Sequence, residues 1–328
     1  MKSLYIQAHA KDAASLAIGL QELDTPEITA DEVLVEIKAA GVNASDALAA
    51  IGYFDHAKTP RIPGRDFAGT IVKGPKELIG ENIWGTEGTA GIDFNGTHTQ
   101  YMALPISAVA TIPTTLSLEQ AGSVTLPYVT AYYAIVKRSQ LSKGKSCLVI
   151  GALGQVGRAA MAIAHWLGAN PVAVVRGEEE LKKAQAEGLK AVDSTEKDFE
   201  QQAIALNNGK AFDVILNSVG TILWKPLLKA LAKGGHLATI SAPPNHRIAE
   251  VSLFELYRAN QTLVGVNTVP LDFNENAALL NALKPGFESG QLTAPREDEI
   301  KRFTMEQATE AYQAVLDPTI KERIVLIF

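Results

Sequence analysis

The feature that most constrains the fold is a regular alternation of apolar strand-like segments and helical stretches between residues 146 and 269. The strand-like segments are nearly continuous runs of Val, Ile and Leu, which indicates strands buried on both faces. Strands of this kind, connected by helices, form a parallel sheet covered by helices. We predict strands at 146–152, 171–176, 212–219, 236–242 and 261–269, and helices near 156–167, 178–188, 196–206 and 222–232.

The region before residue 120 has a different pattern. Residues 31–43 alternate apolar and polar side chains with the period of two that is typical of a half-buried strand. Other short strand-like pieces are separated by Gly and Pro, so this region predicts a small β-barrel. The last segment, 270–328, has mixed character and ends on a strand-like run. We therefore expect the end of the chain to rejoin the first domain.

Composition excludes several classes of function. The chain has 328 residues, a net charge of −6 and one cysteine, Cys147. A single thiol cannot form an internal disulfide, so we expect a reducing, cytoplasmic location. No stripe of Lys and Arg is present, which argues against a nucleic acid or an anionic membrane as a partner. We also expect no signal peptide and no membrane span, because the apolar runs are too short.

A glycine-rich segment, LVIGALGQVGRAA (148–160), contains an A-x-G-x-x-G variant of the dinucleotide-binding fingerprint. It follows a predicted strand and opens a predicted helix, which is the context in which such a loop binds a pyrophosphate. We expect Gly151 to relieve the turn, Gly154 to admit the pyrophosphate and Gly157 to pack the helix against the strand. A strand–helix turn without any ligand is the alternative interpretation.

The residues around this loop predict which cofactor it binds. The backbone N–H groups of Gln155 and Val156 begin the helix and would face the phosphates. The second strand ends at Arg176, where an NAD-binding unit places an acid for the ribose hydroxyls. An arginine can instead pair with a 2′-phosphate, so the sequence favours NADPH. The glutamates at 178–180 would oppose that phosphate if they faced it, and Arg176 could also be a solvated surface charge.

Six segments, in this order, resemble the medium-chain dehydrogenase/reductase superfamily: AAGVNASDALAAIGYF, PRIPGRDFAGTIV, LPYVTAYYAI, GALGQVGRAA, DVILNSVG and LAKGGHLATIS. The closer match is to its zinc-independent quinone oxidoreductase branch, which is zeta-crystallin-like and includes enoyl reductases. The resemblance implies an α/β chain with a GroES-like catalytic barrel, residues 1–124 and 270–328, and a doubly wound Rossmann domain for NADP(H), residues 125–269. Substrate and nicotinamide would meet between these domains.

The resemblance also implies cofactor contacts outside the glycine loop. It places Thr130 near the nicotinamide, and Asn217, Ser218 and Ser241 around the ribose and adenine. NADP-using members often have a Ser at the position of Arg176 and a Lys four residues later, where this chain has a glutamate. A 2′-phosphate would therefore depend more heavily on Arg176.

The resemblance further implies that no metal is bound. Zinc-dependent relatives carry an early Cys ligand, a Gly-His-Glu segment and a lobe with four cysteines. The corresponding blocks here read GVNASD and PRIPGRDFAG, and Cys147 alone cannot build either zinc site.

Without a metal, another group must polarise the substrate oxygen and supply a proton. Asn43 offers an amide, and Tyr53 could hydrogen-bond a carbonyl or act as a general acid. Asp46, Phe54 and Tyr128 are the expected lining of the substrate pocket, although Asp46 could instead brace the helix that follows and Asn43 could be a turn residue. Related enoyl-thioester reductases carry their proton-donating tyrosine at the position of Phe54, so the tyrosine here is shifted by one.

The combined prediction is an oxidoreductase that transfers a hydride from NADPH to a small molecule, either a quinone or the β-carbon of an enone. Three alternatives stay open: a reductase of enoyl thioesters, a protein that binds NADPH without catalysis, and an alcohol dehydrogenase. We also expect a homodimer through the apolar edge strand 261–269.

Overall fold

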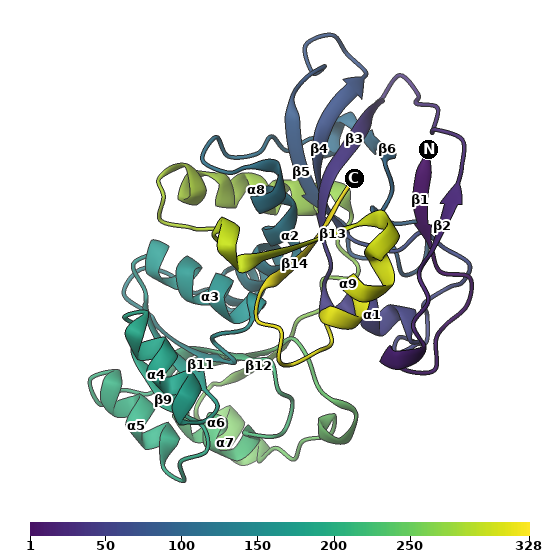
Figure 1. Cartoon of the computed structure of the whole chain (residues 1–328). Helices are drawn as coiled ribbons and strands as arrows, with labels where there is room; N and C mark the ends of the chain where they lie inside the picture. The colour runs from purple at the N-terminus through teal and green to yellow at the C-terminus, as the bar shows by residue number, and fades with distance from the viewer. The chain divides into compact units, whose positions relative to one another are not determined.

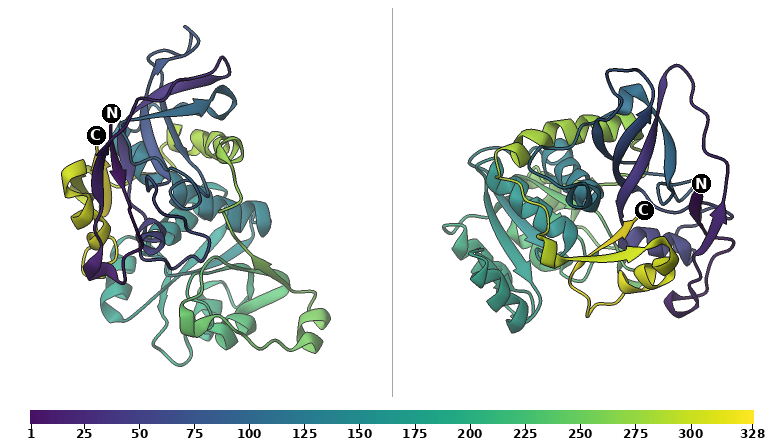
Figure 2. Two further views of the ribbon diagram at one scale, coloured as in Figure 1. Left: turned by 90° about the vertical axis from the view of Figure 1, so that its right-hand side faces the viewer. Right: turned by 45° about the horizontal axis from the view of Figure 1, so that its top comes forward.

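The computed structural model describes residues 1–328, which form two compact units (Figure 1). The first unit contains residues 1–126 and 269–328, and the second contains residues 127–268. Both chain termini therefore lie in the first unit (Figure 2). The helices of both units lack the length and apolar character that a membrane crossing requires.

The first unit is built on a mostly antiparallel six-stranded sheet. Its strand order is β13-β14-β3-β4-β5, and β6 also pairs with β3. The C-terminal strand β14 runs antiparallel to β3, with Val325 opposite Gly41. A separate hairpin pairs β1 with β2. The strands are β1 (Lys2–Tyr5), β2 (Gly19–Glu22), β3 (Glu32–Gly41), β4 (Asp66–Lys73), β5 (Asn82–Thr86), β6 (Tyr101–Pro105), β13 (Ile300–Thr304) and β14 (Arg323–Ile327).

Alternating burial in these strands explains the core of the first unit. Val33, Val35 and Ile37 of β3 are buried and pack with Phe67 and Ile83. These residues have the period of two that places every second side chain on the same face of a strand. The helices of this unit are α1 (Ala44–Ala50), the first part of α2 (Leu118–Tyr132), α8 (Phe273–Glu288) and α9 (Ala308–Ala314).

The second unit is a parallel sheet flanked by helices, which confirms the predicted doubly wound fold (Figure 1). Its order, β9-β8-β7-β10-β11-β12, places the first strand, β7, beside the point where the order reverses. The strands are β7 (Ser146–Ile150), β8 (Asn170–Val175), β9 (Ala191–Asp193), β10 (Phe212–Asn217), β11 (Leu231–Thr239) and β12 (Thr262–Gly265). The helices are α3 (Gln155–Trp166), α4 (Glu178–Ala186), α5 (Phe199–Leu206), α6 (Trp224–Ala230) and α7 (Leu253–Arg258).

Several predicted boundaries differ from the structure. The helix predicted at 222–232 ends at Ala230, and β11 begins at the next residue. The strand predicted at 261–269 contains only the four residues Thr262–Gly265. The sequence pattern did not predict β9 or α7, because three and six residues are too few to show a period.

Candidate functional site

The glycine loop follows β7 at the carboxyl end of the parallel sheet, next to the reversal of strand order. Gly151 has φ +70°, a left-handed conformation that glycine adopts without strain. The N–H of Gly151 donates to the carbonyl oxygen of Val174 at 3.0 Å, and the carbonyl oxygen of Gly151 accepts from the N–H of Gly154 at 3.0 Å. The backbone thus requires a glycine at the first position of the loop.

Gly157 is required by the packing of α3. A Cβ at this position would overlap the carbonyl oxygen of Gly151 and lie 2.8 Å from the Cα of Ala152. Ala152 is itself completely buried. Only a glycine therefore lets the first turn of α3 approach the loop this closely, as the sequence predicted.

Neither backbone conformation nor packing within the protein requires a glycine at position 154. It is the N-cap of α3, with φ −76° and ψ 168°, an extended backbone that any residue adopts. A Cβ there would meet only the carbonyl oxygen of Gly151, at 3.3 Å, which a small shift would relieve. The N–H groups of Gln155 and Val156 follow in the first turn, where they have no acceptor within the helix. This stretch of exposed backbone fits a pyrophosphate.

Arg176 lies directly after β8, and its guanidinium is exposed and makes no hydrogen bond or ion pair. Its backbone N–H donates to Oε2 of Glu180 at 2.9 Å, so the Glu180 carboxylate lies over the same loop. The next N–H, of Gly177, donates to Oδ1 of Asp193 at 2.7 Å. A free cation is thus present for a 2′-phosphate, but two carboxylates are hydrogen-bonded to the same backbone segment and oppose the binding of an anion.

Asn217 and Ser218, the predicted ribose and adenine contacts, form hydrogen bonds that shape the loop after β10. Asn217 is fully buried; its Nδ2 donates to the carbonyl oxygen of Gly220 at 2.9 Å and its Oδ1 accepts from the N–H of Val219 at 3.0 Å. The hydroxyl of Ser218 donates to the carbonyl oxygen of Ile150 at 2.9 Å and so ties β10 to β7. These side chains shape the loop, and each keeps hydrogen-bonding capacity, so their contacts with the cofactor stay a prediction.

The other predicted cofactor contacts are more accessible. Ser241 is exposed after the end of β11, and Thr130 is half-buried in α2. Both lie in the second unit. Tyr128, a predicted pocket residue, also lies in the second unit and is only 5% exposed.

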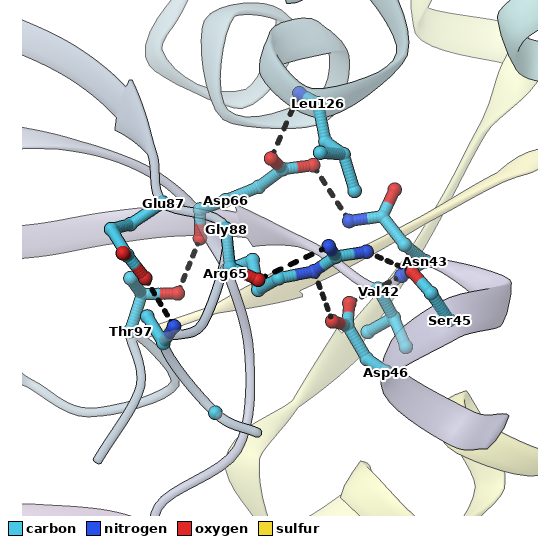
Figure 3. A network of polar contacts seen from close by, with 12 residues as sticks. Val42, Asn43, Ser45, Asp46, Arg65, Asp66, Glu87, Gly88, Thr97 and Leu126 are labelled. Carbon is cyan, nitrogen blue, oxygen red and sulfur yellow. Dashed lines mark hydrogen bonds and ion pairs between the residues drawn. The ribbon is translucent and has the colours of Figure 1, made fainter. Parts of the chain in front are cut away.

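A second cluster of functional candidates lies in the first unit, where α1 meets β4 (Figure 3). Asp66 is fully buried and accepts four hydrogen bonds. The donors are Nδ2 of Asn43 at 2.8 Å, the hydroxyl of Thr125 at 2.7 Å, the N–H of Leu126 at 2.9 Å and Nη2 of Arg323 at 3.2 Å. Burial raises the pKa of Asp66, and the Arg323 guanidinium opposes that rise.

Arg323 explains why Asn43 is less available than the sequence predicted. The guanidinium of Arg323 is buried and donates to Oδ1 of Asn43 at 2.9 Å and to the carbonyl oxygens of Val42 and Ser123. Both ends of the Asn43 amide are thus held inside the network, and the residue is only 7% exposed. One N–H of Asn43 is left for the predicted contact with a substrate oxygen.

Asp46 braces the start of α1, which is the alternative role that the sequence left open for it. Its Oδ2 accepts from the backbone N–H of Asn43 at 2.8 Å, one half of a capping box at the start of α1. Its Oδ1 lies 3.3 Å from Nε of Arg65, and both side chains are buried. The sequence reasoning missed Arg65 and Arg323, because no local pattern connects either residue with its partners.

Tyr53 and Phe54 lie together in the loop after α1. Their rings meet edge to face, with centroids 5.3 Å apart, and both are half-buried. Phe54 packs against Ala49, Ala57 and Ile92. The two aromatic rings thus lie side by side, and their role as a substrate pocket stays a prediction.

The next question is which side chains could coordinate a metal ion. The His, Cys, Asp and Glu side chains of the chain form no cluster of three that could hold a metal ion. Cys147 is buried in β7, and burial raises the pKa of its thiol to about 12. The thiolate that a zinc ion requires is therefore unfavourable at this position.

Two family models match the chain. Residues 29–114 match the alcohol dehydrogenase GroES-like domain, and residues 156–283 match a domain described as zinc-binding dehydrogenase. A zinc-type alcohol dehydrogenase-like protein of Schizosaccharomyces pombe is 32% identical over 322 residues, which is 97% of this chain and 94% of that protein. A 2-methylene-furan-3-one reductase of Solanum lycopersicum is 30% identical over 88% of this chain and 69% of its own length.

More distant matches cover the same chain. A quinone oxidoreductase-like protein 2 homologue of Nematostella vectensis is 24% identical over 93% of this chain and 84% of its own length. A reducing polyketide synthase of Hypomyces subiculosus is 26% identical over 99% of this chain, but this chain spans only 14% of that protein. Among solved structures, an alcohol dehydrogenase superfamily protein from Novosphingobium aromaticivorans has a TM-score of 0.86 and 26% identity, with 100% of this chain and 99% of that chain covered.

Proposed function

This oxidoreductase belongs to the medium-chain dehydrogenase/reductase superfamily, and we propose that it uses NADPH to reduce a quinone or an α,β-unsaturated carbonyl compound without a metal ion. The names of two relatives, a 2-methylene-furan-3-one reductase and a quinone oxidoreductase-like protein, support this class of acceptor. Both acceptors are electron-poor π-systems that accept a hydride at carbon and place negative charge on oxygen.

The observation that carries the cofactor proposal is the exposed backbone at Gly154. Neither backbone conformation nor packing explains a glycine there, whereas the close approach of a pyrophosphate does. The N–H groups of Gln155 and Val156 would hold the pyrophosphate, and Arg176 would pair with the 2′-phosphate. Thr130, Asn217, Ser218 and Ser241 stay proposed contacts. When bound, the cofactor supplies the hydride.

The first unit supplies the candidates that act on the acceptor. The remaining N–H of Asn43 and the hydroxyl of Tyr53 are the proposed donors to its oxygen, and the ring of Phe54 would pack against its planar face. Water or Tyr53 would deliver the proton.

The metal-free part of the proposal rests on which side chains are present. The one thiol is buried with a raised pKa, and the histidines and carboxylates are dispersed or committed to other partners. A catalytic zinc site needs three protein ligands around one open position. We therefore expect activity in the presence of a chelator.

A panel of acceptors tests the proposed function. NADPH and NADH would be mixed with quinones, enones, enoyl-CoA thioesters and aldehydes in buffer containing a chelator, and oxidation of the cofactor would be followed by absorbance. The expected result is NADPH-dependent turnover of quinones or enones. Turnover of aldehydes alone, or turnover that needs added zinc, would overturn the proposal.

An enoyl-thioester reductase is the second candidate. The match to a segment of a reducing polyketide synthase favours it. The position at which related thioester reductases carry a tyrosine is Phe54 here, which counts against the same proton donor. The enoyl-CoA arm of the panel separates the two candidates.

We further propose that the protein is cytoplasmic and forms a homodimer that pairs through β12. This strand is at the edge of the parallel sheet, and Leu263 on it is 36% exposed. Leu253, Phe254 and Tyr257 of α7 are more than 60% exposed, so this unit carries a cluster of uncovered apolar side chains. Sedimentation of the protein at micromolar concentration tests this proposal, and a monomer would contradict it.

A further inference from the structure

Arg158 lies in the first turn of α3, directly after Gly157, and both its backbone and its side chain are bonded to the glycine loop. Its Nε donates a hydrogen bond to the carbonyl oxygen of Leu153 at 3.1 Å. Its backbone N–H donates to the carbonyl oxygen of Gly154 at 2.8 Å. One residue thus holds two consecutive carbonyl oxygens of the loop that is proposed to bind the pyrophosphate.

The guanidinium of Arg158 is itself fixed by Glu187, the C-cap of α4. Nη1 of Arg158 is 2.8 Å from Oε2 of Glu187, and Nη2 is 3.0 Å from Oε1. Two parallel hydrogen bonds of this kind give an arginine–carboxylate pair a defined geometry. Every nitrogen of the guanidinium therefore has a partner within the protein, in contrast to the exposed guanidinium of Arg176.

The direction of the loop carbonyls decides how well the loop can accept an anion, because a carbonyl oxygen that faces a phosphate repels it. In a trans peptide unit the C=O and the N–H point in opposite directions. The unit between Leu153 and Gly154 is fixed at both ends, since its carbonyl accepts from Arg158 and its N–H donates to the carbonyl oxygen of Gly151 at 3.0 Å. This unit sets the direction of the N-cap, after which the free N–H groups of α3 begin.

We propose that Arg158 is a positioning residue that holds the glycine loop in the conformation that accepts the pyrophosphate, and that Glu187 fixes Arg158 for this role. This inference rests on the proposed function and adds two residues that it did not name. NADPH and NADH both carry the pyrophosphate, so the effect applies to both cofactors. Since the two side chains act on the loop and not on the reacting atoms, they determine cofactor affinity and leave kcat at saturating NADPH unchanged.

Titration of variants with NADPH, NADH and 2′-AMP tests this assignment. Arg158→Gln and Glu187→Gln are each expected to raise the Kd of both dinucleotides about 3–10-fold. The double variant is expected to show no further loss, because either substitution removes the same contact. 2′-AMP carries the 2′-phosphate but no pyrophosphate, so its Kd is expected to stay at the wild-type value. The kcat at saturating NADPH is also expected to match wild type.

The sign of the Glu187→Gln effect separates positioning from simple charge attraction. If Arg158 acted by attracting the phosphates, removal of the nearby carboxylate would lower the Kd, and Arg158→Lys would bind as wild type. A positioning role predicts a raised Kd in both variants, because a lysine has one ammonium in place of the planar fork. The matched control is Arg302→Gln, which breaks a pair with Glu119 in the first unit and is expected to bind both cofactors as wild type. The side chains of Arg302 and Glu119 are 38% and 32% exposed, against 41% and 34% for Arg158 and Glu187.

Three results would overturn the assignment. These are wild-type Kd values for both dinucleotides in Arg158→Gln and Glu187→Gln, a lowered Kd in Glu187→Gln, and an equal loss of affinity for 2′-AMP, which would indicate a general disturbance of the unit. Thermal unfolding of each variant accompanies the titrations, and an exposed pair is expected to change the unfolding temperature little.

The two proposals fail in different ways, because the titrations need no acceptor. A wild-type protein that binds NADPH but reduces neither quinones nor enones would contradict the proposed function, and a raised Kd in Arg158→Gln and Glu187→Gln would still support the positioning role. If wild type is active and these variants are indistinguishable from it, the failure belongs to Arg158 alone. A wild-type protein that binds neither dinucleotide would overturn both proposals.

Discussion

The guanidinium of Arg323, in the last strand of the chain, lies 3.2 Å from the carboxylate of Asp66, at the start of β4, and both side chains are almost completely buried. This ion pair connects β14 to the network that holds Asn43 at the start of α1. The end of the chain therefore helps to set the geometry of the candidate site. Gly41 makes room for it, because a Cβ there would overlap the Arg323 guanidinium.

Removing one partner of this pair is expected to destabilise the protein strongly. Arg323→Met leaves the Asp66 charge buried without its counter-ion, which typically costs about 3–5 kcal/mol. The control is Arg296→Met, at an exposed ion pair with Asp298, where about 1 kcal/mol or less is expected. Urea unfolding measures both values. An equal decrease in the free energy of unfolding in the two variants would show that the buried ion pair contributes no more than the exposed one.

Stability is expected to depend on pH through His98. Burial lowers the pKa of His98 from 6.5 to about 4, and its Nδ1 is 2.9 Å from the hydroxyl of Tyr312. As pH falls below 6.5, the unfolded chain binds the proton first, so the free energy of unfolding decreases. The contribution is complete above pH 6.5 and is lost by pH 4, a total of about 3 kcal/mol.

The measurement is the free energy of unfolding between pH 7.5 and 4.5 for wild type, His98→Gln and His56→Gln. His98→Gln is expected to lose this acid-sensitive component, whereas His56→Gln, which removes an exposed histidine, is expected to keep it. An identical pH dependence in wild type and His98→Gln would show that His98 is not the group involved.

Gly154 and Gly157 are expected to respond differently to substitution by alanine. Gly154→Ala should change the free energy of unfolding by only about 1 kcal/mol, because the backbone at residue 154 is unstrained and its surroundings are open. Gly157→Ala should cost about 1–3 kcal/mol through overlap with the loop backbone.

Binding of NADPH should show the complementary result. We expect Gly154→Ala to raise the Kd about tenfold or more, since the new methyl group occupies space that the pyrophosphate needs. Titration followed by nicotinamide fluorescence, together with thermal unfolding, gives both quantities. Wild-type affinity in Gly154→Ala would mean that the loop does not hold the pyrophosphate.

Cofactor preference is expected to follow the charges beside β8. Arg176→Ala should raise the Kd of NADPH about 10–100-fold and leave the Kd of NADH unchanged. The substitution removes the proposed charge-assisted hydrogen bond to the 2′-phosphate. Glu180→Gln removes the negative charge of the side chain that accepts from the Arg176 N–H, and it should lower the Kd of NADPH by a few-fold. Titration of each variant with both cofactors checks this. An unchanged ratio of the two Kd values in Arg176→Ala would exclude the arginine as the discriminating group.

The parts of the fold that depend on local sequence patterns were predictable from the sequence. Runs such as Cys147–Ile150 indicated buried parallel strands, and the spacing of Gly151 and Gly157 reported a left-handed turn and a close helix contact. The short strand β9 was not predictable, since three residues show no period.

The polar network around Asp66 could not be predicted from local sequence patterns. Arg323 and Asp66 are 257 residues apart, and Asp46 in α1 is 19 residues before Arg65, which directly precedes β4. Their pairing depends on the arrangement of the strands and helices, so the sequence could indicate Asn43 and Asp46 as polar residues near a helix start but not what would occupy them. The buried turn hydrogen bonds of Asn217 likewise appear only in the structure.

The most direct measurement is transfer of deuterium from NADPH labelled at C4 to an enone, with a quinone in parallel, in buffer with a chelator. We expect loss of the cofactor absorbance with formation of the saturated ketone, and mass spectrometry should find one deuterium, located at the β-carbon. For the quinone, we expect stoichiometric hydroquinone. Absence of transfer to both acceptors, or transfer only after zinc is added, would contradict a metal-free NADPH-dependent reductase.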